Sequence, residues 1–222
     1  MKPDVYKRET CRLCGCGRLE RVIELVPTPP GNHFVARRDL GTMQKAYPLD
    51  INFCGDCHHV QLGHVVQPEI LYQKNYSYVS GTSPVFVKHL KDYASHVVSR
   101  FALPAQGLVL DIGSNDGTAL SFFQTAGYKV LGIDPATEIV ADANCKGIET
   151  LCEFFGIEVA HKYTDQYGKA MLINAHNACA HIDDLKGAQA LLPLVRSCSI
   201  WFYQRDSPLM LRKSGPFPNM ER

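Results

Sequence analysis

From residue 84 onward, apolar residues follow helical and strand periods in regular alternation. Residues 84–101 have apolar side chains at helical spacing, which predicts an amphipathic helix. Short apolar runs then alternate with further helical segments. We predict strands at 108–111, 129–133, 149–151 and 170–175, and helices at 118–126, 137–145, 157–167 and 183–194. This alternation indicates an α/β domain with a parallel sheet that helices cover on both faces.

The region before residue 84 follows a different pattern. Residues 47–54 alternate weakly, and a second short apolar stretch lies at 59–63, so we predict two short strands of a zinc-ribbon-like module. Residues 71–83 form a polar segment that contains Tyr72, Tyr76 and Tyr78. We interpret it as a loop that lines the mouth of a substrate site, although packing of these tyrosines within a linker stays open.

Two Cys-x-x-Cys pairs lie in the N-terminal region, and together they can close a tetrahedral four-thiolate zinc site. The four cysteines are Cys11, Cys14, Cys54 and Cys57. Because protein would fill every position around the metal, the predicted zinc is structural. Cys16 could replace Cys14, and His58 or His59 could replace Cys57. Reduced cysteines in a small core are a further alternative.

Residues 108–117 read Leu-Val-Leu-Asp-Ile-Gly-Ser-Asn-Asp-Gly, an apolar strand that ends in glycines and leads into a helix. Such a turn lets a nucleotide-like ligand approach bare backbone amides, and Asp134 stands where an acid would take the ribose diol. The dinucleotide-binding pattern requires glycine at position 115, where this chain has Asn115. Asp111 precedes Gly113, as an acid does in S-adenosylmethionine (SAM) methyltransferases. We therefore expect SAM, with a nicotinamide oxidoreductase or a plain strand–turn–helix as the alternatives.

A third polar segment, 174–181, leaves the last predicted strand at the edge where ligands bind in such sheets. Asn177 and His181 are four residues apart and would share a face if this turn is helical. One would then face the amino-acid end of the cofactor and the other the methyl acceptor, although His181 could also be a capping or core histidine. Phe155 follows the third strand, where it could cover an adenine ring or pack in the core.

The composition narrows the class of protein. Among 222 residues, 23 are Lys or Arg and 22 are Asp or Glu, so the charge offers no basis for nonspecific nucleic-acid binding. The N-terminus lacks the apolar run of a signal peptide, and no stretch stays apolar long enough to cross a membrane. We expect a cytoplasmic protein without a membrane partner, in which nine cysteines serve as metal ligands and free thiols rather than disulfides.

Taken in order, these motifs resemble the zinc-binding, SAM-dependent sugar C-methyltransferases, which methylate a carbon of nucleotide-linked 4-keto-deoxysugars. The matching segments, within residues 8–195, are 11–15, 47–50, 54–57 with 59–62, 76–82, 111–117, 132–135 and 177–184. The resemblance implies a nucleotide-sugar substrate and an N-terminal zinc module. It also implies a SAM-binding, Rossmann-like sheet and a further C-terminal domain. We expect a zinc-binding module at 1–70, a substrate loop and linking helix at 71–103, a SAM-binding domain at 104–195 and a divergent tail at 196–222.

The resemblance also implies residue roles. Tyr76 and His181 would face the sugar and act in catalysis. The expected cofactor-binding residues are Asp111, Gly113, Asn115, Gly117, Asp134, Phe155 and Asn177. In the implied reaction a base removes the proton beside the keto group, donors hold the enolate oxygen, and the carbon attacks the sulfonium methyl group.

The tail departs from the family pattern. Residues 196–222 match neither the family strand that reads like Gly-x-Phe-Val-Phe-Glu nor the following Glu-His pair that includes the proposed base. We hypothesise a frameshifted or prematurely ended reading frame near Val195, an incomplete sheet and impaired catalysis. A noncatalytic zinc- and SAM-binding chain is the alternative. The apolar residues 198–203 could still add one strand.

Overall fold

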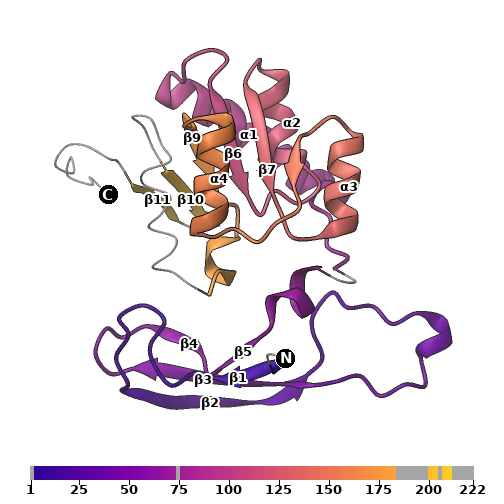
Figure 1. The fold of residues 1–222 in the computed structure, drawn as a ribbon, viewed down its shortest axis with the longest axis vertical. Helices are drawn as coiled ribbons and strands as arrows, with labels where there is room; N and C mark the ends of the chain where they lie inside the picture. The colour runs from indigo at the N-terminus through magenta and orange to yellow at the C-terminus, as the bar shows by residue number, and fades with distance from the viewer. Residues whose placement is uncertain (1–2, 74–75, 184–199, 205–206, 212–222) are drawn as a thin grey trace. The chain divides into compact units, whose positions relative to one another are not determined.

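The structure is a computed structural model that describes residues 3–73, 76–183, 200–204 and 207–211. Its contacts divide the chain into two compact units, Met1–Tyr78 and Val79–Arg222. The first unit is built from short strands and long loops, and the second from alternating strands and helices (Figure 1). Within the described ranges, no helix has both the length and the apolar character that crossing a bilayer requires.

The first unit contains two small antiparallel sheets. One has the strand order β2-β3-β4, formed by Leu19–Thr28, Tyr47–Cys54 and Val60–Leu62 (Figure 1). The other pairs β1 (Val5–Lys7) with β5 (His64–Val66). The strands predicted near residues 47 and 60 are confirmed. No strand was predicted for the residues that form β2. This strand contains Pro27, which is tolerated because β2 lies at the edge of its sheet.

Two short helical turns complete this unit. They are the 3₁₀ turn η1 (Arg37–Asp39) and the π-helical turn η2 (Glu69–Gln73). The polar segment predicted as a loop at 71–83 therefore begins inside η2, and it ends in another 3₁₀ turn, η3 (Ser80–Thr82), which belongs to the second unit.

The second unit is built on a six-stranded sheet with the order β11-β10-β9-β6-β7-β8. In chain order these strands are β6 (Leu108–Ile112), β7 (Lys129–Ile133), β8 (Thr150–Leu151), β9 (Leu172–Asn174), β10 (Ile200–Gln204) and β11 (Ser207–Leu211). All neighbours are parallel except β10 and β11, which are antiparallel. From the central strand β6, strands β7 and β8 follow outward on one side in chain order, and β9, β10 and β11 follow on the other side. This is the strand order of a Rossmann-like sheet.

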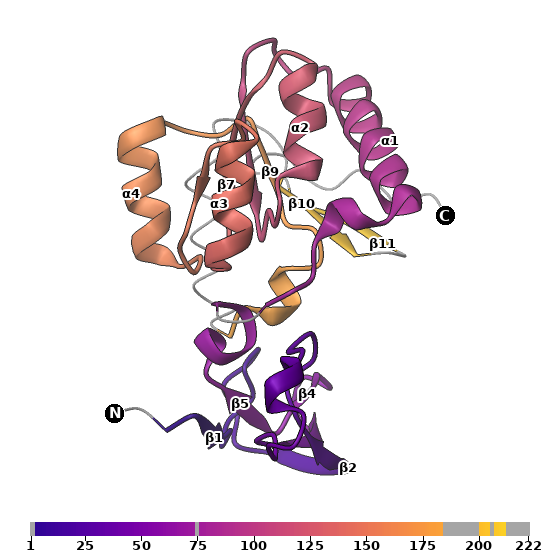
Figure 2. The ribbon, with the colours of Figure 1, turned by 90° about the vertical axis from the view of Figure 1, so that its right-hand side faces the viewer.

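Helices cover both faces of this sheet, as predicted (Figure 2). They are α1 (Pro84–Phe101), α2 (Thr118–Thr125), α3 (Thr137–Cys145) and α4 (Ile157–Tyr167). Alternate residues of β6 point to opposite faces: Val109 packs in a cluster with α1 and α2, whereas Leu110 packs in a cluster with α4. Both side chains are fully buried.

The start and end of α1 follow from its sequence. Ser83 caps the helix by accepting a hydrogen bond from the Phe86 amide at 3.4 Å, and Pro84 occupies the first turn, where its missing N–H costs nothing. Ala102 then ends the helix in a left-handed conformation with φ of 45°. The predicted bounds of this helix are confirmed.

The other elements predicted between residues 108 and 175 are confirmed with small changes at their ends. The strand predicted at 149–151 is Thr150–Leu151, and the strand predicted at 170–175 is Leu172–Asn174. The helix predicted at 183–194 lies outside the described residues beyond its first position. The strand suggested at 198–203 is β10, which pairs in parallel with β9.

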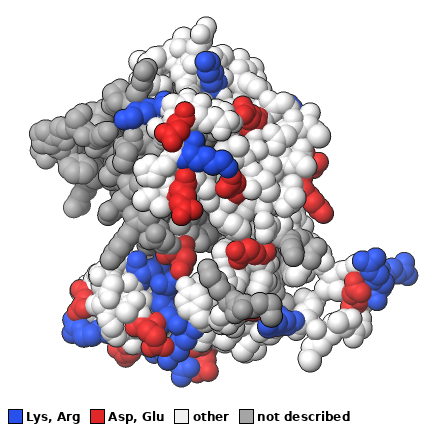
Figure 3. Space-filling view, in the orientation of Figure 1, with Lys and Arg blue, Asp and Glu red and all other residues white. Residues whose placement is uncertain are grey.

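Positive and negative side chains are mixed at the surface. On the face drawn in Figure 3, Lys and Arg side chains are interspersed with those of Asp and Glu, in line with the nearly equal totals in the sequence.

Candidate functional site

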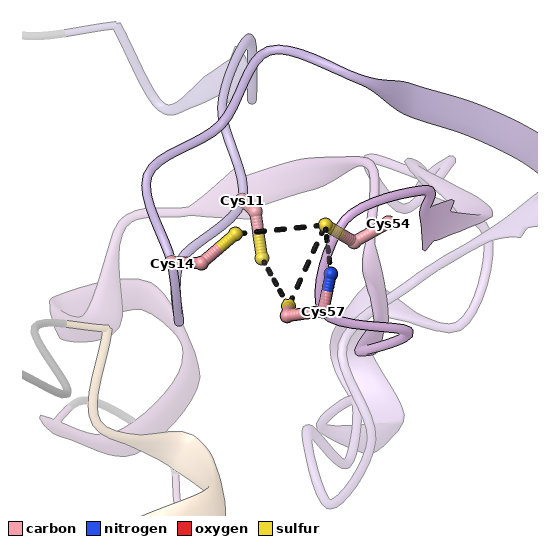
Figure 4. Close-up of side chains that lie close together, drawn as sticks. All are labelled: Cys11, Cys14, Cys54 and Cys57. Carbon is pink, nitrogen blue, oxygen red and sulfur yellow. Dashed lines mark hydrogen bonds between the residues drawn. The ribbon is translucent and has the colours of Figure 1, made fainter.

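Four cysteines of the first unit form a cluster that could hold a metal ion (Figure 4). They are Cys11, Cys14, Cys54 and Cys57, and all four sulfur atoms lie within 4.8 Å of one another. The Sγ atoms of Cys11 and Cys57 are 3.6 Å apart, those of Cys14 and Cys54 also 3.6 Å, and those of Cys54 and Cys57 3.5 Å. Zn–S bonds of about 2.3 Å in a tetrahedron separate the sulfurs by about 3.8 Å. The cluster therefore fits a four-thiolate zinc ion.

Tight turns bring each cysteine pair into place. In the first pair, the Gly15 amide donates to the Cys11 carbonyl at 2.8 Å, which closes the turn around Cys14. In the second, which begins at the last residue of β3, the His58 amide donates to the Cys54 carbonyl at 2.9 Å. The Cys57 amide reaches Cys54 Sγ at 3.5 Å, and this hydrogen bond, with help from neighbouring thiols and against burial, lowers the pKa of Cys54 to about 6.

The alternative ligands lie outside this group of four. Cys16 Sγ is 3.2 Å from Cys54 Sγ, closer than two sulfurs on one tetrahedral zinc. The His58 ring stacks on Phe53 with a centroid distance of 5.6 Å. The geometry therefore favours the four-cysteine set over a set with Cys16 or His58.

In the second unit, the candidate cofactor residues gather at the carboxyl ends of β6, β7 and β9. From β6 the chain continues to β7 and β8 on one side, and it then crosses to β9 on the other side of β6. Ligands of such sheets bind in the crevice at this switch point. Asp111 of β6 is paired in register with Asn174 of β9, and Asp134 follows β7 directly. The segments that follow β6, β7 and β9 were predicted from the sequence to meet at this edge, because ligands bind outside the carboxyl ends of parallel strands.

The turn after β6 has the backbone that its glycines predict. Gly113 has φ of 70° and Gly117 has φ of 74°, both in the left-handed region. A Cβ atom at Gly117 would lie 2.7 Å from Ile148 Cγ2, and one at Gly113 would lie 2.6 Å from Ala178 Cβ. No other residue fits at either position without moving its neighbours.

Two backbone amides, those of Asn115 and Ala136, hold the Asp134 carboxylate. The Asn115 amide donates to Asp134 Oδ2 at 2.9 Å, and the Ala136 amide donates to Asp134 Oδ1 at 2.9 Å. Burial raises the pKa of Asp134, while these two amides oppose the rise and the charge of Asp111 adds to it. Each carboxylate oxygen has two lone pairs, so Asp134 keeps capacity for further donors.

The sequence reading did not assign a role to Asp116, which the structure shows at the start of α2. Asp116 Oδ1 accepts hydrogen bonds from the Thr118 amide at 3.2 Å and the Thr118 hydroxyl at 2.7 Å. Its other oxygen lies 3.5 Å from Lys146 Nζ. Asp116 is only 4% exposed, so this pairing compensates a buried charge. The spacing Asp-x-Thr ahead of a helix could have indicated this turn.

His176 is a second residue that sequence reasoning missed. Its Nδ1 lies 3.7 Å from Asp111 Oδ1, and its ring meets the Tyr93 ring edge to face at 4.6 Å. The Tyr93 hydroxyl lies 2.8 Å from Asn174 Oδ1. The position of His176, two residues beyond the end of β9, was the available signal.

Several buried polar atoms at this edge lack a hydrogen-bond partner within the described part of the chain. They are Asp111 Oδ1, Ser114 Oγ and Asn174 Nδ2. Native proteins rarely leave such atoms unsatisfied, because each costs the full desolvation of a polar group. The edge therefore fits a polar ligand that offers both donors and acceptors.

Three further residues were predicted to belong to the site, namely Asn177, His181 and Phe155. The helical turn there is η4 (Cys179–His181), and Asn177 precedes it with φ of 56°. Asn177 and His181 therefore do not lie on one helical face, in contrast to the sequence-based expectation. Both residues are exposed. Phe155 packs against the core cluster on the α4 face of the sheet.

Tyr76 belongs to the first unit. Its ring meets that of Tyr72 edge to face at a centroid distance of 5.8 Å, and both tyrosines are half-buried. Burial raises the pKa of Tyr72.

Comparisons with known proteins find similarity both in the N-terminal cysteine-containing segment and over most of the chain. Residues 11–72 match a family described as "Putative zinc binding domain". Over 196 residues, the chain is 32% identical to the C-methyltransferase NovU of Streptomyces niveus, a match that covers 86% of this chain and 46% of NovU. The chain thus spans about half the length of this curated relative.

Solved structures also resemble the chain. The plantazolicin methyltransferase BpumL, in complex with a pentazolic desmethylPZN analog and SAH, is 18% identical over 55% of this chain and 48% of that chain, with a TM-score of 0.44. Magnesium protoporphyrin IX methyltransferase (ChlM) from Synechocystis PCC 6803, with bound SAM, is 16% identical over 57% of this chain and 62% of that chain, with a TM-score of 0.42. At these TM-scores the likenesses add nothing to the strand order described above.

Proposed function

We propose that this chain, a member of the zinc-binding C-methyltransferases, transfers a methyl group from SAM to a carbon of a nucleotide-linked keto-deoxysugar. The observation that carries the proposal is the loop from Gly113 to Gly117 at the switch point of the sheet, with Asp134 held beside it by two backbone amides. The similarity to a C-methyltransferase over 86% of this chain supports the reaction class.

The zinc ion has a structural role in this proposal. The four cysteines would supply all four ligands of a tetrahedral zinc ion, which would leave no position for water or substrate. Because Cys11 and Cys14 come from one loop and Cys54 and Cys57 from another, the metal ties together two segments that are about forty residues apart.

SAM would supply an electrophilic methyl group carried on a sulfonium. Asp134 would accept hydrogen bonds from the ribose diol through the lone pairs that its two amide donors leave free. Gly113 and Gly117 keep the backbone of the loop clear of side chains where the ligand approaches. Asp111, Phe155 and Asn177 complete the proposed cofactor set.

The acceptor carbon becomes nucleophilic when a base removes the proton beside the keto group. His181, which is exposed at the end of η4, is proposed to contact the sugar as a proton acceptor or donor. Tyr76 is proposed as a hydroxyl donor to the sugar. Donors of this kind stabilise the enolate oxygen that forms during proton removal.

The experiment measures ligand binding and turnover separately. Calorimetry with S-adenosylhomocysteine should show binding to the wild type, weakened binding to Asp134→Asn, and unchanged binding to Asp142→Asn, an exposed acid on α3 that serves as the matched control. Mass spectrometry should then detect a methylated product from SAM and a keto-deoxysugar nucleotide. Absence of binding to the wild type, or equal binding to Asp134→Asn, would contradict the proposed site.

A second function is a noncatalytic chain that binds zinc and SAM. It is favoured by residues 196–222, which match none of the family segment that contains the proposed base. Binding of S-adenosylhomocysteine without any methylated product would support this second function over the first.

A further inference from the structure

Asn115 connects two segments that are far apart in the sequence. Its side-chain Oδ1 accepts a hydrogen bond from the Ser80 amide at 2.8 Å, and its own amide donates to Asp134 Oδ2 at 2.9 Å. Asn115 is 6% exposed and has φ of 53°. Asparagine tolerates this left-handed backbone, and unlike glycine it also has the amide oxygen that reaches Ser80.

The 3₁₀ turn η3 makes a second close contact with the same loop, at Gly81. A Cβ atom at Gly81 would lie 2.6 Å from Asp116 Oδ2 and 2.9 Å from Thr118 Oγ1. The backbone of η3 therefore lies directly against the start of α2, with no room for a side chain between them. Two neighbouring residues of η3 thus rest on two neighbouring residues of the loop.

The side chains of Asn115 and Asp116 in this loop have contacts within the second unit. Asp116 Oδ1 accepts from the Thr118 amide and hydroxyl, and Asp116 Oδ2 lies near Lys146 Nζ. The Asn115 side-chain oxygen accepts from the Ser80 amide of η3. The expected role of Asn115 as a direct cofactor contact does not account for its hydrogen bond with the Ser80 amide, which no local sequence pattern indicated.

We propose that Asn115 is a positioning residue that holds η3 on the loop, so that ligand binding at the loop also stabilises η3. For its ligand, this inference rests on the proposed function. Because η3 begins shortly after Tyr76 in the chain, the loop anchors the C-terminal end of the tyrosine-containing segment. Binding at the loop and ordering of that anchor are then thermodynamically coupled, and the coupling is reciprocal.

Hydrogen exchange of the Ser80 amide, followed by NMR without ligand, tests the contact itself. Asn115→Gly keeps a residue suited to positive φ and removes the side chain that carries the Oδ1 acceptor. Loss of one hydrogen bond should make the Ser80 amide exchange about three- to tenfold faster. Gly81→Ala should speed the same exchange from the other side of the contact, because its Cβ atom displaces η3.

The matched control is Asn32→Gly. Asn32 also has positive φ, at 59°, but it is exposed and lies in the other unit. This variant should leave the exchange of Ser80 unchanged. An unchanged rate at Ser80 in Asn115→Gly would overturn the contact between Asn115 and η3.

The coupling is tested by adding S-adenosylhomocysteine. It should slow the exchange of Ser80 in the wild type and have little effect there in Asn115→Gly at saturation. Equal slowing in both proteins would overturn the coupling. If calorimetry shows that the wild type binds no S-adenosylhomocysteine, the proposed function and the coupling both fall, and the ligand-free comparison still decides the contact separately.

Discussion

Gly117→Ala should destabilise the second unit through two separable effects. Gly117 has φ of 74°, and an added Cβ atom would lie 2.7 Å from Ile148 Cγ2 and 3.0 Å from Ile148 Cβ. A left-handed backbone costs a residue with Cβ about 1–2 kcal/mol. Ile148 is 3% exposed and cannot move away freely, so overpacking adds about 1–3 kcal/mol. The expected loss in free energy of unfolding is about 2–5 kcal/mol.

Gly127→Ala separates these two effects. Gly127 has φ of 89°, and an added Cβ atom would meet nothing within 4 Å. This control therefore includes the left-handed cost alone. Both variants reduce the entropy of the unfolded chain by a similar amount, so that contribution cancels in their difference. The difference, about 1–3 kcal/mol, then measures the contact with Ile148.

Urea denaturation followed by the helical circular dichroism signal is a suitable assay, because all the α-helices described here lie in the second unit. Equal midpoints and slopes for the two variants would refute the reasoning. They would mean that α2 and the segment around Ile148 relax without cost, and that the loop after β6 is not held as closely as its geometry indicates.

Three further predictions concern other parts of the chain. The protein should bind one zinc per chain; Cys54→Ser should lose the metal, whereas Cys16→Ser should keep it, as metal analysis after gel filtration would show. Burial raises the pKa of Asp134 in the folded chain, so the folded state holds the proton to a higher pH than the unfolded state. The free energy of unfolding of the wild type should therefore fall, relative to that of Asp134→Asn, as the pH rises from the ordinary carboxyl pKa through the raised one. Denaturation series at several pH values would measure this fall. Tyr93→Phe removes the hydroxyl that contacts Asn174 in the core and should cost about 1–3 kcal/mol in urea denaturation.

Each of these has a clear contrary result. Zinc retained by Cys54→Ser, or lost from Cys16→Ser, would argue for a different ligand set. Parallel pH profiles for the wild type and Asp134→Asn would show that this carboxyl titrates alike in the folded and unfolded chain. Wild-type stability of Tyr93→Phe would mean that water or another donor replaces the hydroxyl.

The periodicity of apolar residues determined most of the second unit. Buried parallel strands need continuous apolar runs and covering helices need a one-sided pattern, and both patterns are local. Residues 84–101 are a clear case, since the capping serine, the first-turn proline and the apolar stripe all agree on one helix. The spacing of the cysteine pairs was likewise a local signal, because each turn must hold two sulfurs on one metal.

Only the tertiary structure decided which distant groups meet. The sequence placed residues 174–181 at the same sheet edge as the end of β6, but only the folded strands show that His176 is the residue beside Asp111. No local pattern indicated that η3 folds back onto Asn115. The edge strand β2 was not predicted for a related reason. It forms because it pairs with β3, although its own sequence includes Pro27. Local spacing specifies which element forms. The partner of a polar side chain depends on how elements pack, and that depends on the whole core.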